Sequence, residues 1–301
     1  ILAAPAAIAG FGIIGWLVAA ERTGAVLVMQ VVQNGINIGM SALFVLGFGW
    51  GVAGVAWGSV IAEVSGLVLG LWLCRKGFSG AAWRDWARVG DIATLRRMVA
   101  VNADILIRSV LLLAALMSFL FLSARFGDVP LAATQVLIQF VYLTSYAMDG
   151  VAFAAESLVG QAVGRRDRGA LGRTVRLAAG WGGAFALVLV AAFALAGPAF
   201  IDLLTTAPEV RAEARVHLPW LIAFPLMATA AFVMDGVFIG ATWTRAMRNL
   251  MIVSFMGYGA AVLALVPAFG MTGLWAALSL FLLLRGGTLI RRYPTEAQRV
   301  I

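Results

Sequence analysis

Apolar residues occur along this chain in nine long runs that are separated by short polar segments. Each run has about 20 or more mainly apolar residues, the length that a helix rising 1.5 Å per residue needs to cross a hydrocarbon core about 30 Å thick. The pattern therefore predicts nine membrane-spanning helices. They are expected at residues 1–20, 25–46, 51–73, 99–124, 130–160, 177–204, 216–241, 250–268 and 272–290.

The first three runs and the last three share one layout, in which a short basic loop and then a glycine-containing turn separate the runs. Residues 51–54 (Gly-Val-Ala-Gly) align with residues 270–273 (Gly-Met-Thr-Gly) at an offset of 219, and Pro5 aligns with Pro225 at an offset of 220. This repeat predicts that a complete six-helix unit is preceded by the second half of another. The earlier unit would begin roughly 120 residues before the first residue, which is not Met, so we expect a fragment.

We accordingly expect an all-α polytopic membrane protein with three parts. Residues 1–73 would be the last three helices of an N-lobe, residues 74–98 a cytoplasmic linker, and residues 99–301 a complete C-lobe with a short cytoplasmic tail. An even number of spans in each unit makes the two units parallel, with a cleft between them. The linker contains Trp83-Arg84-Asp85-Trp86, which is compatible with a simple connection or with an interfacial amphipathic helix.

Composition supports a lipid environment, because 62% of the 301 residues are hydrophobic and 12% are charged, with a mean hydropathy of +0.98. The net charge of +8 does not indicate nucleic-acid binding, since the basic residues lie between the apolar runs. Seventeen Arg and Lys residues fall on one predicted side of the membrane and three on the other. The positive-inside rule therefore predicts a cytoplasmic C-terminus.

The residue types present exclude several classes of site. One cysteine and one histidine cannot form a disulfide framework or a Cys/His metal cluster, and the common enzyme signatures are absent, so we expect no enzyme, no metal site and no cofactor. Cys74 is expected to be an inert small hydrophobe. His217, at the start of the seventh run, is expected to be a hydrated interfacial residue.

Polar residues in the fifth run recur at helical spacing. They step by four, three, four, three and seven positions, and so remain within about a third of the helix circumference. These residues are Gln135, Gln139, Tyr142, Tyr146, Asp149 and Glu156. Ile138 and Phe153 are the only large apolar residues expected on that face. Hydrogen bonding to neighbouring helices is one explanation, but the two carboxylates favour a face that lines a water-filled cavity.

Further ionisable residues interrupt other runs. Asp235 lies in a Met-Asp-Gly-Val sequence that also occurs around Asp149, and an acid followed by glycine suits a site where a cation or proton reaches a carboxylate. Asp104 and Arg108 are one turn apart, a spacing that permits an intrahelical ion pair with a structural role. Glu63 is one turn from Ser59 and could be a proton site or a buried packing acid.

Three segments resemble the MATE family (multidrug and toxic compound extrusion), in particular its DinF-like branch. They are Asn102-Ala103-Asp104-Ile105 with Arg108-Ser109, the segment from Asp149 to Ala162, and the segment from Asp235 to Ala241. The resemblance covers essentially the whole chain. It implies a fold of two six-helix lobes around a central cleft, of which this chain would carry nine of the twelve helices.

The resemblance also implies a function. Such a protein would be a secondary antiporter of the bacterial inner membrane that exports organic, often cationic, small molecules in exchange for H+ or Na+, without nucleic acid and as a monomer. The family's N-lobe cation site would involve Asn37 and Ser59, but the acid common one turn after that asparagine is Ser41 here. We therefore place ion coupling on Asp149, Glu156 and Asp235, in a cleft with the residues named above.

Three alternatives remain at this stage. A lipid or polysaccharide flippase of the same superfamily would have a larger and more basic cleft, for which Arg108 is the main candidate. A membrane scaffold or receptor would scatter its polar residues and carry a soluble domain. An embedded aspartyl enzyme would need a second catalytic motif, which the sequence lacks.

Overall fold

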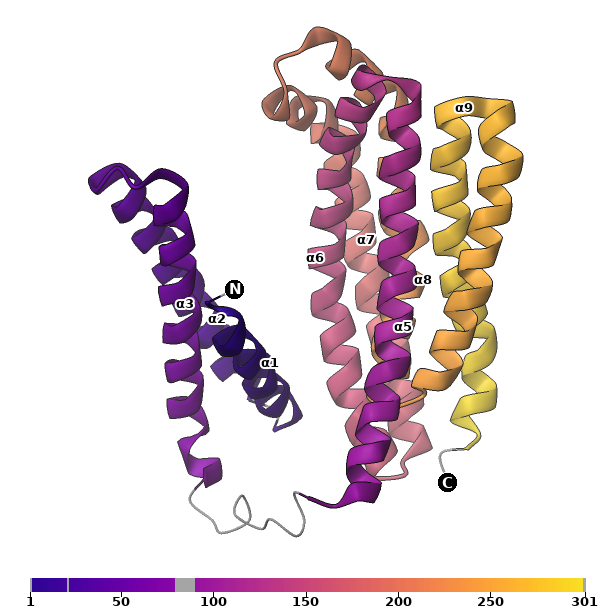
Figure 1. Cartoon of the computed structure of the whole chain (residues 1–301). Helices are drawn as coiled ribbons and strands as arrows, with labels where there is room; N and C mark the ends of the chain where they lie inside the picture. The colour runs from indigo at the N-terminus through magenta and orange to yellow at the C-terminus, as the bar shows by residue number, and fades with distance from the viewer. Residues whose placement is uncertain (1, 21, 79–89, 300–301) are drawn as a thin grey trace. The chain divides into compact units, whose positions relative to one another are not determined.

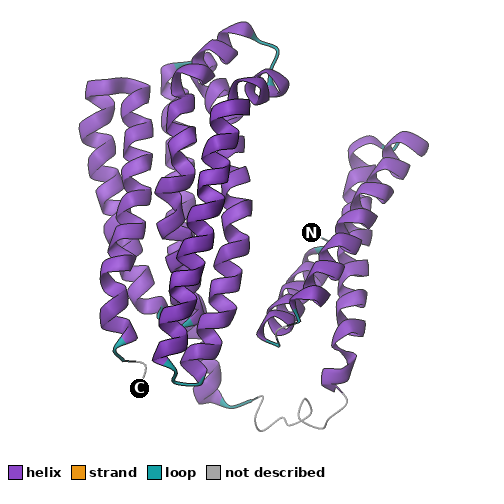
Figure 2. Cartoon of the chain, turned by 180° about the vertical axis from the view of Figure 1, so that it is seen from behind, coloured by secondary structure: helices purple, strands orange, loops and turns teal. Residues whose placement is uncertain are grey.

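A computed structural model describes residues 2–20, 22–78 and 90–299, all of which lie in helices or short connections, with no strand among them (Figure 2). The chain divides into two compact units, Ile1–Ala93 and Thr94–Ile301. The segment Trp83-Arg84-Asp85-Trp86 lies outside the described residues.

The first unit contains three helices that pack on one another. They are α1 (Ala4–Ala19), α2 (Thr23–Ala42) and α3 (Gly51–Cys74), with the π-helical turn η1 (Leu43–Gly47) after α2 and the 3-10 turn η2 (Arg75–Phe78) after α3. Their shared core is small, with Leu17, Met29 and Cys74 as its buried members. The burial of Cys74 agrees with the expected role as a small hydrophobe.

A row of small residues lets α3 approach α2 closely. The buried positions of α3 recur every four residues at Gly54, Gly58, Ala62, Gly66, Gly70 and Cys74. A Cβ atom at Gly58 would come within 2.6 Å of Ser41 Oγ, and one at Gly66 within 2.6 Å of Gln33 Oε1. Small residues at a helix interface are typical of membrane proteins, because they bring the two backbones together.

The second unit is a bundle of longer helices (Figure 1). It contains α5 (Ile92–Ser123), the 3-10 turn η4 (Ala124–Phe126), α6 (Asp128–Gly164), α7 (Arg168–Leu204), α8 (Pro208–Gly240) and α9 (Thr244–Ala297). Of these, α8 is the most enclosed and packs on α6, α7 and α9. Backbone contact between α8 and α6 is direct, since a Cβ at Gly236 or Gly240 would overlap the carbonyl oxygen of Ala152 or Glu156.

The helix α9 contains the last two predicted spans. Its 54 residues are interrupted at Gly270, where φ is 57° and ψ is −131°, so the chain turns there from one helix into the next. Gly51, the residue aligned with Gly270 in the predicted repeat, also has a positive φ of 53°. Glycine adopts such angles without the steric cost that a Cβ would bring.

Seven described helices are long and apolar enough to cross a membrane, and Ala4–Ala19 is a shorter apolar helix. Because α9 includes two of the predicted spans, these helices account for all nine apolar runs. The prediction of an all-α polytopic membrane protein is confirmed.

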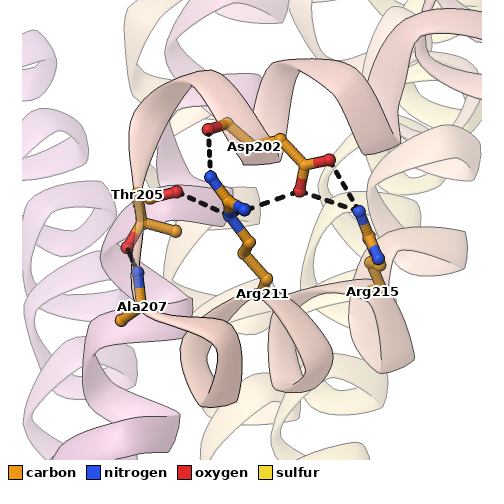
Figure 3. Close-up of polar contacts among 5 residues, drawn as sticks. All are labelled: Asp202, Thr205, Ala207, Arg211 and Arg215. Atoms are coloured by element: carbon orange, nitrogen blue, oxygen red, sulfur yellow. Dashed lines mark hydrogen bonds and ion pairs between the residues drawn. The ribbon is translucent and has the colours of Figure 1, made fainter.

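The connection between α7 and α8 is held by charged residues (Figure 3). Arg215 donates to both carboxylate oxygens of Asp202 at 2.7 Å, while Arg211 donates to the Asp202 and Thr205 carbonyls at 2.8 and 2.7 Å. Proline begins α8 at Pro208, which suits the first turn of a helix because its missing N–H would have no partner there.

Candidate functional site

The centre of the second unit contains a cluster of three charged residues, each from a different helix. Arg108 of α5 and Arg285 of α9 both donate hydrogen bonds to Oδ2 of Asp235, which lies in α8. The side chains of Arg108, Asp235 and Arg285 are 13%, 7% and 5% exposed. We refer to Arg108, Asp235 and Arg285 as the charge triad.

The pocket around the charge triad excludes water. The pocket is lined otherwise by Met247, Leu250, Met251 and Leu289, and it has no room for a water molecule. Three of the triad's buried polar atoms, Arg108 Nε, Asp235 Oδ1 and Arg285 Nε, have no hydrogen-bond partner among the described residues. Ionised side chains are costly inside a membrane unless they are paired, so the two arginines depend on this one carboxylate.

The triad has two positive charges and one negative charge. A further acid, Asp149 of α6, lies within electrostatic range of Asp235, Arg108 and Arg285. Together these four residues are neutral when all are ionised. Asp149 and the triad therefore form one electrostatic unit, in which a change of charge on Asp149 alters the balance around the arginines.

The predicted intrahelical pair between Asp104 and Arg108 is wrong. Asp104 instead binds Arg248 of α9 at 2.5 Å and accepts a hydrogen bond from Thr244 at 3.2 Å, while Arg108 turns to Asp235. Both residues are partly buried between helices, where Asp235 of α8 accepts from Arg108 and two residues of α9 donate to Asp104. They join helices to one another, which agrees with the expectation of a structural role.

The polar residues of α6 lie on a face that their own unit leaves uncovered. Gln135, Gln139, Tyr142 and Tyr146 are exposed, the latter two by 43% and 73%, and the two tyrosine rings stack with centroids 6.5 Å apart. We call these four residues, with Asp149 and Glu156, the polar stripe. Ile138, which was expected on this face, is instead 4% exposed and packs in the core.

The two carboxylates of the polar stripe are half-buried, and neither forms an ion pair with any residue in the described part of the chain. Asp149 has the triad nearby, whereas Glu156 lies where the backbones of α6 and α8 touch at Gly240. Both differ from Asp235 and Asp104, which arginines already neutralise. No arginine in the described residues forms an ion pair with either acid of the polar stripe.

In the first unit, the structure brings together two of the predicted site residues. Asn37 Nδ2 donates to Ser59 Oγ at 3.2 Å, and Ser59 Oγ donates to the carbonyl of Val55 at 3.0 Å. Ser41 Oγ is buried without a hydrogen-bond partner, beside Gly58. Glu63, one turn beyond Ser59 on α3, is partly buried.

His217 is not the hydrated residue that the sequence predicts. It is 3% exposed, its Nε2 lies 3.3 Å from Glu213 Oε1, and its ring stacks on Trp275 with centroids 6.3 Å apart. Trp275 comes from the second part of α9, which covers the start of α8 in a way that the local sequence does not reveal. No group of three or more His, Cys, Asp or Glu side chains that could hold a metal occurs among the described residues.

Sequence reasoning also missed the partners of the triad and of Asp104. Arg248 was counted for topology alone. Arg285 was placed inside a predicted span without a partner, although a charged residue within an apolar run is itself a sign of a buried partner.

Comparison with known sequences identifies the family. The sequence pattern of the MatE family matches residues 105–265, more than half of the chain. This chain belongs to the MatE family. DNA damage-inducible protein F of Escherichia coli K12 is 37% identical over 95% of this chain and 62% of its own length. Protein DETOXIFICATION 43 of Arabidopsis thaliana is 26% identical over 98% of this chain and 55% of its own length.

Solved structures agree on the fold. A mutant of the Vibrio cholerae MATE transporter VcmN matches with a TM-score of 0.84 and 16% identity, over 99% of this chain and 68% of that one. A MOP superfamily transporter from Pyrococcus furiosus matches with a TM-score of 0.76 and 17% identity, over 91% and 62%. The MATE and DinF resemblance and the MATE-type fold are thus confirmed. Family members are transporters rather than enzymes. The chain spans less than two thirds of the length of the Escherichia coli and Arabidopsis thaliana relatives.

Proposed function

We propose that the full-length protein exports organic, often cationic, compounds across the bacterial inner membrane in exchange for protons or sodium ions. The polar stripe on α6 supports this proposal most directly. Six polar residues follow one side of a membrane-spanning helix, and four of them are exposed on the unit that contains them. Acyl chains cannot hydrogen-bond these groups, so a water-filled passage is the surrounding that suits them.

In this proposal the acids of the second unit have different roles. Asp149 and Glu156 have no arginine partner in the described residues, and they exchange protons or sodium ions. Asp235 is a positioning residue, because a cation could bind its carboxylate only by displacing Arg108 or Arg285. Gln135, Gln139, Tyr142 and Tyr146 line the path, where tyrosine faces attract organic cations. Asp104 and Arg108 hold α5 to its neighbours.

Competition for negative charge would couple the two fluxes. A cationic compound and an incoming proton or sodium ion both require the ionised carboxylate of Asp149 or Glu156. Loading one excludes the other, so export and ion entry alternate as the protein rocks between its two open states.

The larger architecture is also part of the proposal. Residues 1–73 would end an N-lobe, residues 74–98 would link the lobes in the cytoplasm, and residues 99–301 would be the whole C-lobe. The N-lobe contribution would come from Asn37, Ser59, Ser41 and Glu63. The protein would act as a monomer.

The flippase alternative depends on Arg108 as a basic group that lines a cleft. Arg108 is instead bound to Asp235 in a pocket without room for water. This pairing leaves it unavailable for a lipid phosphate, so the observation favours the export of small molecules.

Efflux by the full-length protein tests the proposal. We expect Asp149→Asn and Glu156→Gln each to reduce export of a fluorescent organic cation by tenfold or more, as about 1.4 kcal/mol or more of lost coupling interaction implies. Proton and sodium gradients, imposed separately on proteoliposomes, would identify the coupling ion. Membrane abundance must be measured for each variant, since loss of folding would mimic loss of transport.

Asp128→Asn is the matched control, because Asp128 begins the same helix but is exposed and lies outside the polar stripe. It should export at the wild-type rate. Wild-type export by both Asp149→Asn and Glu156→Gln would show that the carboxylates of the stripe do not couple transport.

A further inference from the structure

A groove of about 450 Å³ runs between α6 and α7 on the exposed surface of the second unit. Its lining includes small residues of α6, such as Gly150 and Ala154, and large apolar residues of α7, such as Leu177, Trp181 and Phe185. Leu177, Trp181 and Phe185 are 62%, 63% and 46% exposed. The described residues therefore leave an apolar groove exposed along two membrane helices.

The groove has the length of one membrane leaflet. Its α7 side runs from Thr174 to Phe185, and at 1.5 Å per residue this distance is about 16 Å. Half of a hydrocarbon core about 30 Å thick is about 15 Å. Trp181 is seven residues from Thr174 and four from Phe185, so its ring lies towards the end of the groove away from Thr174, at the depth of acyl chains. A transmembrane helix of another protein would need about twice this length.

Unpaired positive charges lie at the Thr174 end of the groove. The residues from Arg165 to Arg176, in the α6–α7 turn and the first turns of α7, include the exposed side chains of Arg165, Arg166, Arg173 and Arg176. None of these four has an acid within ion-pair distance among the described residues. The one acid of the turn, Asp167, caps α7 by accepting from the Ala170 amide at 2.8 Å.

Helical geometry connects the charges with the groove. Arg173 is four residues before Leu177, so the two share one face of α7 and the guanidinium lies one turn from the groove wall. Arg165 is seven residues after Leu158, which also lines the groove, and shares its face of α6. The apolar groove thus ends near arginine side chains, at the level in the membrane where lipid headgroups lie.

We propose that this groove binds an anionic glycerophospholipid from the leaflet on the arginine side. One acyl chain lies between α6 and α7 over Gly150 and Ala154, and the phosphate binds Arg165 and Arg173. Basic pockets at membrane interfaces attract anionic lipids by about 1 kcal/mol for each Lys or Arg, which corresponds to about a fivefold preference for each arginine. This site is separate from the polar stripe, which follows the adjacent face of α6.

Quenching of Trp181 by brominated lipids tests the proposal in the full-length protein. Nanodiscs of phosphatidylcholine would contain a small, equal fraction of either chain-brominated phosphatidylglycerol or chain-brominated phosphatidylcholine. The signal of Trp181 is the difference between the wild-type protein and Trp181→Phe. We expect the brominated phosphatidylglycerol to be at least about fivefold more effective, and the double variant Arg165→Gln/Arg173→Gln to lose this preference.

Filling the groove provides a second readout. Ala154→Leu should abolish the preference for phosphatidylglycerol, because the larger side chain fills part of the groove. Ala191→Leu, on an exposed part of α7 outside the groove, should retain the preference. Equal quenching of wild-type Trp181 by the two brominated lipids would overturn the proposal, even if the variants fail to fold. Retention of the preference in folded Ala154→Leu would also overturn it. Neither result would alter the case for efflux, which depends on Asp149 and Glu156.

Discussion

Asp235 contributes to the second unit chiefly by neutralising two arginines. The hydrogen bonds from Arg108 and Arg285 join α5, α8 and α9 at one oxygen atom in a pocket without room for water. Desolvation of three charges is unfavourable, but removal of the shared carboxylate would be worse, because it leaves two guanidinium groups buried together. Loss of the shared acid should therefore destabilise the protein more than loss of either arginine.

This difference gives a prediction about stability. Asp235→Asn should destabilise the protein by about 3–5 kcal/mol, whereas Arg285→Gln should cost less, since Arg108 remains paired with Asp235. The matched control is Asp202→Asn, because Asp202 also lies between two arginines but is 38% exposed, and exposed pairs contribute about 0–1 kcal/mol. Thermal unfolding midpoints in detergent would rank the variants. Equal shifts for Asp235→Asn and Asp202→Asn would contradict this explanation.

Sequence spacing could not predict which side chains pair. Asp104 and Arg108 satisfy the one-turn rule for a helix, yet each binds a residue more than 100 positions away. The rule considers only the residues of one helix, whereas the partners here are an acceptor on α8 and donors on α9. His217 shows the same limitation, since a distant tryptophan covers it.

At the scale of helices, close backbone contact positions the polar stripe. Gly236 and Gly240 of α8 lie against the carbonyl groups of Ala152 and Glu156, so α6 cannot rotate without separating from α8. The contact fixes which side of α6 is buried and which remains uncovered. Glycine is required at both positions because no Cβ fits between the two backbones.

We predict that Gly236→Ala and Gly240→Ala each destabilise the packing of α6 on α8 by about 1–3 kcal/mol, the usual cost of an overfilled interface. Gly183→Ala is the control, because a Cβ there meets no atom within 4 Å and alanine favours a helix. Thermal unfolding of the three variants would check this prediction. A stabilised Gly236→Ala protein would show that the two helices are not in backbone contact.

The helices themselves were largely predictable, because a run of apolar residues long enough to cross a bilayer has few alternatives to a helix. The turn at Gly270 was also foreseen from its glycines, and its positive φ matches that of Gly51. The edges of helical faces were less predictable. Ile138 falls within the angular range of the polar stripe, yet it is buried, since core residues of neighbouring helices reach that edge of α6.

At the scale of the whole molecule, orientation in the membrane follows from the distribution of basic residues. Most of them would lie on the side of the α6–α7 turn and the end of α9. On the opposite predicted side, two of the three arginines, Arg211 and Arg215, are engaged by Asp202 at the α7–α8 connection (Figure 3). Insertion machinery retains clusters of arginine on the cytoplasmic side, so both the α6–α7 turn and the C-terminus should be cytoplasmic.

Labelling of single cysteines in intact cells would test this orientation. In a background of the full-length protein from which Cys74 and any further cysteine are removed, Thr206→Cys, between α7 and α8, should react with a membrane-impermeant maleimide added outside. Gly164→Cys, at the end of α6, and Gln298→Cys, after α9, should react only after the membrane is permeabilised. All three positions are exposed, so a difference in labelling reports the side of the membrane rather than burial.

Labelling of Gly164→Cys in intact cells with protection of Thr206→Cys would reverse the orientation and place the arginines of the proposed lipid site in the outer leaflet. The positive-inside rule disfavours that arrangement, because each arginine there would have had to cross the membrane.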